Sequence, residues 1–451
     1  MRRLVLAVAV SVIGGAAGVA RAARPVLDGE ATFGVAGGDI LVHYATTGTD
    51  AIKPDDATHD GVPAFAVEVA TTAEAALQHF VALGFDRPRS DGTLGGDGRI
   101  DIYLRDLVRA DGNAAIDACT GERCAGFIQA ENDFAGYDYA TITEGIRSVV
   151  PHELFHLVQD GYASGQSSTW TEGTAVWSVE DLYGNGNSDF ERFLPSFLTK
   201  SFRPFERPVT GFGDSYPYGA ALWPYFLEQR FGVGVVVAAW QACVDADFLP
   251  AIDAALAPEM SSTDQAWTEM TRWNVFTGSH AAGGPYPDAS AWPEAPREAA
   301  VSFGGDADLP SGMISVEGLS ARYVPITAGV RAKLQVSPGA LNIAAWVVRD
   351  GGTIHDGVAL TADTDALAPS GALAAMLDAG SYTLVITGLA RNTITTPVAV
   401  ELGLPLAPDP SEPDDSGGCR ATQSPSSSLI ALALALMVTS QLTRRPDRRR
   451  A

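Results

Sequence analysis

Residues 152–156 read His-Glu-Leu-Phe-His, the pattern H-E-x-x-H. Residues four apart lie on one face of an α-helix, so His152 and His156 can offer two imidazole nitrogens to one metal ion. Glu153 lies beside them, where its carboxylate can accept a proton from a metal-activated water. The alternative is a pair of surface histidines on an amphipathic helix. The chain has only 7 histidines, and this scarcity favours the metal interpretation.

A two-histidine site needs a third protein ligand, and catalytic zinc keeps its fourth position for water. Glu172 lies 16 residues after His156, inside a second helix that we predict over residues 168–177. The Gly- and Ser-rich residues 160–167 can form the turn that returns the chain to the first helix. We therefore predict that His152, His156 and Glu172 bind Zn²⁺.

Three other carboxylates compete with Glu172 for this role. Asp160 follows His156 on the same helix face, and we interpret it as a surface group at the end of the helix. Glu180 and Asp181 lie about two turns beyond Glu172. We expect these two acids to accept a hydrogen bond from the imidazole N–H of a ligand histidine.

The metal motif and its flanks resemble the gluzincin-type predicted metalloproteases of secreted myxobacterial proteins, over roughly residues 60–280. The residues that carry this resemblance are 96–104, 152–156, 170–177 and 218–223. It implies a zincin-like domain, zinc held by His152, His156 and Glu172, and Glu153 as the general base.

A tyrosine is expected to assist the reaction. Tyr218, in the segment Ser-Tyr-Pro-Tyr-Gly, could donate a hydrogen bond to the oxyanion of the tetrahedral intermediate. Tyr216 and His280 are alternative candidates for this role, and a tyrosine that only forms a wall of the site is the other interpretation.

Pro151 directly precedes the first predicted ligand. A proline in a helix interior removes a hydrogen bond and clashes with the preceding turn. The helix therefore either begins near Ser148, with Ser148 as its N-cap and Pro151 in the first turn, or is kinked at Pro151.

The chain has 451 residues, of which 46% are hydrophobic, and a formal net charge of −24. This length predicts two globular domains with flanking segments. An acidic surface repels nucleic acid and anionic lipid, so we predict no nucleic-acid partner. We expect a monomer that acts on a peptide or protein substrate.

We predict an α+β protein in which a zincin-like metalloprotease domain precedes a β-sandwich domain. The predicted segments are a signal peptide (1–22), a pro-region or domain edge (23–62), the zincin-like catalytic domain (63–298), the β-sandwich (299–405), an acidic Pro/Ser-rich linker (406–427) and an apolar sorting segment with an Arg tail (428–451).

The two ends of the chain predict export and surface attachment. Arg2 and Arg3, an apolar run and Ala20-Arg21-Ala22 form a signal peptide with a cleavage site. At the other end, the apolar run 429–438 is shorter than a bilayer-spanning helix and precedes an arginine cluster. With the preceding Gly-Cys, this end resembles the myxobacterial C-terminal sorting domain. That resemblance implies cleavage near Cys419 and display at the outer surface, anchored or released.

Within the predicted catalytic domain, helical periodicity over residues 65–84 predicts an amphipathic helix. A Gly-rich turn then leads into a strand at residues 99–104. Asp97 and Asp101 could bind calcium, but the full ligand pattern is missing, so we predict turn chemistry. We predict that a strand at residues 126–130 forms the edge of the cleft, where an extended peptide pairs with it.

The C-terminal region contains short alternating or β-branched runs separated by Gly, Pro and Asp, as expected of a β-sandwich. These runs are residues 313–316, 321–326, 333–336, 343–348, 381–386 and 393–402. We predict a spacer or binding module without a catalytic set.

Cys119 and Cys124 flank a short polar turn and could form a disulfide in an oxidising compartment, with a zinc pair as the alternative. Cys243 lies in an apolar run and is predicted to be a buried thiol.

Two functions follow from these observations. The first is a secreted zinc-dependent peptidase with Glu153 as general base. The alternative is a surface-displayed adhesion or binding protein that contains an inactive zincin-like domain. The intact set of ligands and base favours the peptidase.

Overall fold

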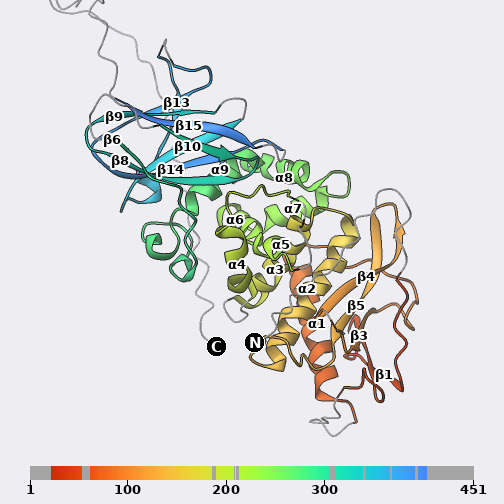
Figure 1. Cartoon of the computed structure of the whole chain (residues 1–451). Helices are drawn as coiled ribbons and strands as arrows, with labels where there is room; N and C mark the ends of the chain where they lie inside the picture. Colours follow the sequence, from red (N-terminus) through yellow and green to blue (C-terminus); the bar gives the residue numbers. More distant parts are fainter. Residues whose placement is uncertain are drawn as a thin grey trace, which may run out of the picture. The chain divides into compact units, whose positions relative to one another are not determined.

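The computed structural model describes residues 22–52, 61–108, 110–184, 189–207, 209, 213–303, 311–338, 342–365, 368–391 and 395–403. These residues belong to one compact unit and form helices and three five-stranded sheets (Figure 1). The predicted mixed α+β class is confirmed. The predicted signal peptide (apart from Ala22), linker and sorting segment lie outside the described residues.

The first sheet has the strand order β1-β2-β3-β5-β4. Its strands are β1 (Glu30–Phe33), β2 (Ile40–Ala45), β3 (Ile100–Arg105), β4 (Gly112–Thr120) and β5 (Arg123–Glu131). β2, β3 and β5 run parallel to one another, whereas β1 and β4 are antiparallel to their neighbours at the two edges. Residues 30–45 are therefore part of the same sheet as the strand that leads to the metal motif.

The prediction that residues 126–130 form the edge of this sheet is wrong. These residues lie in β5, which pairs with β3 on one side and β4 on the other, so β4 is the edge strand. A tight turn after Thr120 folds β4 back onto β5, and Cys119 and Cys124 form a disulfide across this hairpin. The sequence of β4 is rich in Ala, Asn and Asp, which are weak strand formers, so its pattern was not recognised.

Two long helices, α1 (Ala64–Leu83) and α2 (Ile142–Tyr162), pack against one face of this sheet (Figure 1). The predicted helix at residues 65–84 is confirmed as α1, which ends at Gly84 with a φ of 109° that favours glycine. The rings of Phe80 and Phe155 meet edge to face at 5.0 Å in the core between α1 and α2. This packing fixes α2 on the sheet.

The helices that follow contribute to the same core. They are α3 (Ser168–Tyr183), α4 (Asp189–Leu198), α5 (Tyr216–Gly219), α6 (Leu222–Phe231), α7 (Gly234–Ala242), α8 (Phe248–Leu256) and α9 (Thr263–Trp273), with short 3-10 helices at Ala257–Glu259, Gly278–His280, Ala289–Ala291 and Ile354–Asp356. Helices α3 and α7 contact α2, and the other α-helices pack on α3 and on one another. Cys243 is a buried free thiol, as predicted, and burial raises its pKa to about 12.

The remaining two sheets have the orders β11-β10-β14-β8-β6 and β12-β13-β9-β15-β7. The strands are β6 (Val301–Phe303), β7 (Ser311–Val316), β8 (Ala321–Ala328), β9 (Ala332–Ser337), β10 (Ile343–Arg349), β11 (Val358–Ala359), β12 (Thr361–Ala362), β13 (Leu373–Leu377), β14 (Gly380–Gly388) and β15 (Thr396–Gly403). Both sheets contribute apolar side chains to one core, and strand β9 alternates buried and half-buried positions. The described residues of the six predicted runs lie in strands, except residue 395, which precedes β15; residues 393 and 394 lie outside the described residues. The shorter strands β6, β11, β12 and β13 were not predicted.

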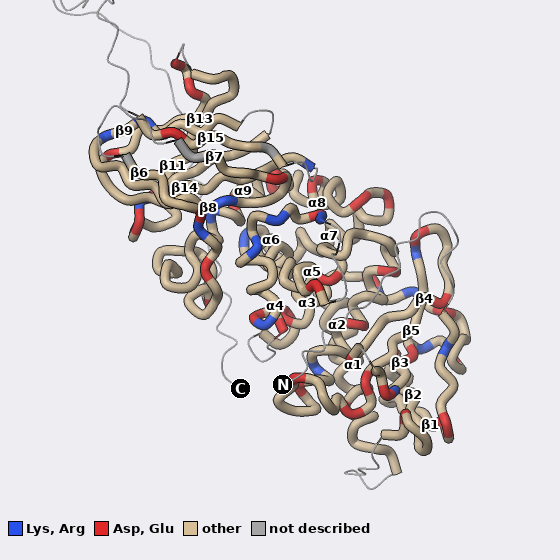
Figure 2. The backbone as a smooth tube through the Cα atoms, viewed as in Figure 1, with Lys and Arg blue, Asp and Glu red and all other residues tan. Residues whose placement is uncertain are grey.

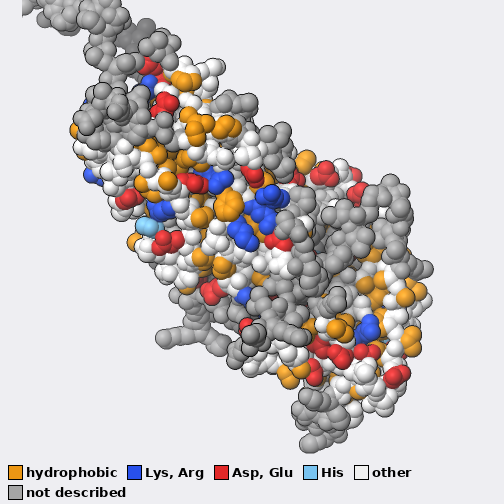
Figure 3. All heavy atoms as spheres, in the orientation of Figure 1, with side chains coloured by type: hydrophobic (Ala, Val, Ile, Leu, Met, Phe, Trp, Pro, Cys, Tyr) orange, Lys and Arg blue, Asp and Glu red, His pale blue; other side chains and the backbone are white. Residues whose placement is uncertain are grey.

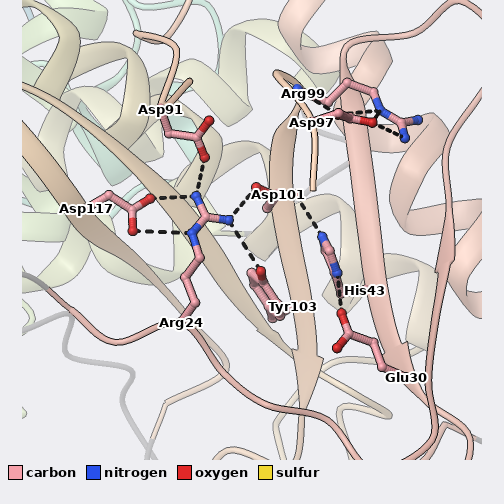
Figure 4. Close-up of polar contacts among 9 residues, drawn as sticks. All are labelled: Arg24, Glu30, His43, Asp91, Asp97, Arg99, Asp101, Tyr103 and Asp117. Atoms are coloured by element: carbon pink, nitrogen blue, oxygen red, sulfur yellow. Dashed lines mark hydrogen bonds and ion pairs between the residues drawn. The ribbon is translucent and has the colours of Figure 1, made fainter. Parts of the chain in front are cut away.

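The other face of the first sheet is crossed by the N-terminal segment, which Arg24 fixes to it (Figure 4). The Arg24 guanidinium donates hydrogen bonds to the carboxylates of Asp91 and Asp101, to both oxygens of Asp117 at 3.3 and 2.6 Å, and to the Tyr103 hydroxyl at 3.3 Å. Its side chain is only 14% exposed. Every N–H of the guanidinium is thus used, and three buried carboxylates share one cation.

We call Arg24 and the three carboxylates of Asp91, Asp101 and Asp117 the Arg24 cage. Asp101 also connects this cage to a buried histidine, His43. The His43 imidazole lies between Asp101, at 2.8 Å, and Glu30, at 2.6 Å, and its ring stacks on Tyr103 (Figure 4). Burial lowers the pKa of His43, but the bonds to Asp101 and Glu30 outweigh it, so the pKa is raised. The network therefore connects β1, β2 and β3 to the N-terminal segment.

The calcium alternative for Asp97 and Asp101 is not favoured, because both carboxylates pair with cations of the chain itself. Asp97 accepts hydrogen bonds from the backbone N–H and the guanidinium of Arg99, which lower its pKa. This is the turn chemistry that the sequence predicted.

The charged side chains are distributed along the whole described backbone, with acidic positions numerous around α1, α2 and β3 (Figure 2). On the face shown in Figure 3, Lys and Arg occur in small groups among acidic and apolar side chains. Within the described part of the chain, no helix is both long and apolar enough to span a membrane.

Replacing Arg24 tests the cage. Arg24→Met leaves three buried carboxylates without their cation, so we expect a loss of about 3–5 kcal/mol in the free energy of unfolding, measured by urea denaturation. The matched control is Arg87→Met, which removes a guanidinium that is 52% exposed and paired with Asp39. Its expected loss is below about 1 kcal/mol. Equal effects of the two variants would contradict the structural role assigned to Arg24.

Candidate metal centre

Helix α2 begins at Ile142, with Thr141 as its N-cap. The Thr141 side chain accepts a hydrogen bond from Glu144 N at 3.0 Å, and the Glu144 carboxylate accepts one from Ala140 N at 2.7 Å. This is close to the reciprocal pattern of a capping box. The prediction that the helix begins near Ser148 is wrong, because this stronger N-terminal signal lies two turns earlier.

Pro151 consequently lies inside α2 rather than in its first turn. Because proline has no backbone N–H, the carbonyl of Arg147 loses its usual helical partner one turn before the metal motif. The motif itself remains helical, and His152 and His156 lie on the same face of α2, as predicted. Both side chains are nearly buried, with 10% exposure each.

Helix α3 brings Glu172 to the two histidines. The Nε2 atoms of His152 and His156 are 3.1 Å apart, and Glu172 Oε2 lies 3.3 Å from the first and 3.4 Å from the second. Donor atoms around a tetrahedral ion with bonds of about 2.0–2.1 Å lie about 3.3–3.4 Å from one another. The three donors thus have the spacing and the chemical types that suit zinc.

Asp160, Glu180 and Asp181, the alternatives to Glu172 as third ligand, do not converge on the two histidines. In the described part of the chain, the group of histidine, cysteine and acidic side chains that converges closely enough for a metal is His152, His156 and Glu172. Asp160 is half-buried at the end of α2 rather than fully exposed, and burial raises its pKa to about 6.

The prediction that Glu180 or Asp181 supports a ligand histidine is wrong. Asp181 pairs instead with His79 of α1 at 2.6 Å. The partner of His156 is Gln159, whose Oε1 lies 2.8 Å from His156 Nδ1. Gln159 lies three residues after His156 on the same helix, so the i, i+3 spacing could have identified it.

Gln159 also fixes α2 to α3. Its amide nitrogen donates to the Thr171 carbonyl at 2.9 Å and to the Thr174 hydroxyl at 3.0 Å. A carboxamide oxygen can only accept, so His156 must carry its proton on Nδ1 in this arrangement. In the neutral form of His156, which metal binding requires, the lone pair of Nε2 is then directed toward His152 and Glu172.

The electrostatics of the cluster favour a bound cation. Burial disfavours the charged form of His156, but Glu172 outweighs it and raises the pKa of His156 to about 10. Burial likewise raises the pKa of Glu172, but His156 and His152 lower it to about 2. In the absence of a metal, a proton on His156 therefore balances the buried carboxylate.

Glu153, next to His152 on α2, lies against the first residue of strand β4. Its Oε2 atom is buried and has no hydrogen-bond partner among the described residues, and burial raises its pKa. A Cβ atom on Gly112 of β4 would collide with Val149 and lie 2.9 Å from Glu153 Cγ. Glycine at position 112 therefore lets the edge strand approach the candidate base, a feature that the sequence did not reveal.

Tyr218, rather than Tyr216, lies at the cluster. Its ring lies parallel to that of His152, with centroids 5.9 Å apart. The Tyr216 hydroxyl instead donates to the Arg203 carbonyl in the core. His280 is in the 3-10 helix Gly278–His280, 3.8 Å from the Glu294 carboxylate, and belongs to a different part of the structure.

Helix α5 can pack close to α3 because α3 has a glycine, Gly173, at the point of contact. A Cβ atom on Gly173, next to Glu172, would lie 3.0 Å from the Ala220 carbonyl carbon, tighter than most real contacts. The glycine thus permits close packing of the segment that carries Tyr218 against the helix that carries Glu172.

Two further hydrogen bonds connect elements next to the site. Tyr139 donates a hydrogen bond of 2.5 Å to Asp111, the residue before Gly112, and burial raises the pKa of Asp111. Ser148, one turn before His152 on α2, donates to Asp189 at the start of α4. The site is therefore bordered by β4, the segment before α2, and α4.

No family model matches the chain, and no curated protein matches it. Among solved structures, the pre-peptidase C-terminal domain of a collagenase from Bacillus anthracis is 11% identical, with 24% of this chain and 95% of that chain covered and a TM-score of 0.18. PliG of Salmonella Typhimurium, a periplasmic inhibitor of g-type lysozyme, is 18% identical, with coverages of 24% and 97% and a TM-score of 0.18. Likenesses of this size support no statement about fold or function.

The raised pKa of His156 predicts proton release on zinc binding. At pH 7.5 the metal-free protein carries a proton on His156, because its pKa is about 10. Zinc requires that lone pair, so binding releases about one proton. Titration calorimetry in phosphate and in Tris should give heats that differ by the ionisation enthalpies of the buffers. Glu172→Gln removes the charge that holds the proton and should abolish the difference. Identical heats for the unaltered protein in both buffers would contradict the electrostatics described.

Proposed function

We propose that the chain is a zinc-dependent peptidase that hydrolyses peptide bonds with Glu153 as general base. The observation that carries this proposal is the convergence of three donor atoms with tetrahedral spacing, next to the buried carboxylate of Glu153, whose Oε2 has no hydrogen-bond partner among the described residues. A sheet with an antiparallel edge strand, followed by two helices that provide the donors, also supports the zincin-like domain that the sequence predicted.

When bound, zinc would supply Lewis acidity, which polarises a carbonyl and acidifies water. Glu153 is placed to accept the proton from the attacking water and to transfer it to the leaving amine. Burial raises the pKa of Glu153, so its carboxylate is a stronger proton acceptor than an exposed one. The unpartnered Oε2 atom is free for this role.

The edge strand β4 is the proposed site for the substrate backbone. Among the described strands it pairs only with β5, and its first residue, Gly112, lies beside Glu153. An extended peptide could add to this edge through main-chain hydrogen bonds, which need no particular side chains. Tyr218, next to His152, is the proposed donor to the oxyanion.

Export, and attachment at the cell envelope through the C-terminal segment, complete the proposal. They rest on the sequence of residues 1–22 and 406–451. The disulfide between Cys119 and Cys124 is consistent with an oxidising compartment.

Replacing Glu153 tests the reaction. Glu153→Gln keeps the size of the side chain but cannot accept the proton, so we expect hydrolysis of an unfolded protein substrate to fall by about a hundredfold to ten-thousandfold. Zinc content, measured by atomic absorption, should remain that of the unaltered protein. Glu180→Gln is the matched control on α3 and should retain activity. Full activity of Glu153→Gln, or an unaltered protein that holds zinc and cleaves nothing in a broad peptide library, would sink the proposal.

Replacing Tyr218 tests its role at the oxyanion. Tyr218→Phe removes only the hydroxyl, so kcat should fall on the order of a hundredfold with KM nearly unchanged. Tyr216→Phe is the control, because that hydroxyl serves the Arg203 carbonyl and its loss should affect stability rather than kcat. A wall tyrosine would instead show a changed KM or no kinetic effect.

A further inference from the structure

Helix α4 carries acidic and basic positions side by side (Figure 2), and its basic residue, Arg192, lies next to the candidate site. Its guanidinium carbon is 5.9 Å from the centre of the Tyr139 ring and 5.3 Å from that of Phe193. The Phe193 ring is in turn 5.0 Å from Tyr218, which stacks on His152. A continuous series of ring contacts thus leads from Arg192 to a predicted zinc ligand.

A second set of contacts also connects Arg192 to the candidate site. Ser148 lies four residues before His152, on the same face of α2, and donates to Asp189. Asp189 Oδ1 is 3.7 Å from Arg192 Nη1. Both sets of contacts therefore place Arg192 beside the segment of α2 and the tyrosine that border the candidate site.

The guanidinium of Arg192 has hydrogen-bonding capacity to spare. The side chain is 27% exposed, and its 3.7 Å contact with Asp189 is longer than a hydrogen bond. It forms no hydrogen bond to any described residue. Arg203, by contrast, is buried and donates two hydrogen bonds to Asp214, at 3.0 and 2.6 Å.

A planar guanidinium packed on aromatic rings is held in a fixed orientation, and its paired N–H groups match the two oxygens of a carboxylate. The competing acid, Asp189, already has its other oxygen bonded to Ser148 and is too distant for a hydrogen bond to Arg192. The N–H groups of Arg192 are therefore available to donate hydrogen bonds to a carboxylate of a ligand.

We propose that Arg192 binds a carboxylate of the peptide substrate, so that the site prefers a peptide with an acidic side chain or a free C-terminal carboxylate near the scissile bond. This inference rests on the proposed peptidase function, because it assigns a substrate class to that same site. The two sources of the carboxylate correspond to an endopeptidase that selects acidic residues and to a carboxypeptidase.

The test measures binding rather than turnover. Zinc-loaded Glu153→Gln protein is titrated with fluorescein-labelled hexapeptides that carry Glu or Gln at one position and end in a free carboxylate or an amide. We expect a carboxylate-bearing peptide to bind about tenfold more tightly than its neutral counterpart, as a charge-assisted hydrogen bond predicts. In the double variant with Arg192→Gln, this difference should disappear while the affinity for the neutral peptides stays the same.

The matched control is Arg147→Gln in the same Glu153→Gln protein. Arg147 is exposed on α2 and lies over the Tyr183 ring at 5.6 Å, so its loss removes one positive charge without touching the Arg192 contacts. The preference for carboxylates should survive this change. Arg192→Lys should retain part of the preference, since it keeps the charge but loses the paired geometry.

Equal affinities for charged and neutral peptides, no binding at all, or a uniform loss of affinity in Arg192→Gln would each overturn the proposal. The peptidase activity of the unaltered protein distinguishes failure of the Arg192 proposal from failure of the proposed peptidase function. Cleavage without a carboxylate preference refutes the role of Arg192 alone. A carboxylate preference that depends on Arg192, in a protein that cleaves no peptide, refutes the peptidase function and leaves Arg192 as a binding residue.

Discussion

The burial of Glu172 between two imidazoles is the interaction on which the rest of the structure depends. The carboxylate is only 6% exposed, and an uncompensated buried charge costs several kcal/mol. His152 and His156 compensate it only if α2 and α3 hold one fixed separation. Gln159 maintains that separation through Thr171 and Thr174, so a single amide connects both helices to the donor set.

Two glycines determine how closely the neighbouring elements approach this donor set. Gly112 lets the edge strand approach Glu153, and Gly173 lets the segment of Tyr218 pack against α3. A larger residue at either position would push apart the elements that carry the candidate base and the candidate oxyanion donor. The chemistry assigned to Glu153 and Tyr218 therefore depends on two glycines, Gly112 and Gly173.

Local periodicity explains which features could be predicted. The spacing of His152 and His156 is a property of one helix, and the six C-terminal runs show strand alternation directly in the sequence. The start of α2 is also encoded locally, in Thr141 and Glu144, whereas only Ser148 was considered as the N-cap. Two local signals of the same kind cannot be ranked without knowing what each side chain contacts.

The remaining features depend on contacts between distant residues. Strand β4 is recognisable only from its pairing with β5, since its own composition favours strands weakly. Asp181 pairs with His79 of α1, 102 residues away in the sequence, and not with a ligand histidine as predicted. Arg24 and Asp117 are 93 residues apart. No periodicity links such pairs, because burial and packing select them after the elements have formed.

The position of Arg24 near the start of the chain has a consequence for processing. With the predicted removal of residues 1–22, Arg24 becomes the second residue of the exported protein, and its side chain is already enclosed by three aspartates of the sheet. The new amino terminus is thus held by the core from its second residue onward. An aminopeptidase in the medium would have to extract a bound guanidinium before it could shorten the chain, so the fold itself protects that end from trimming.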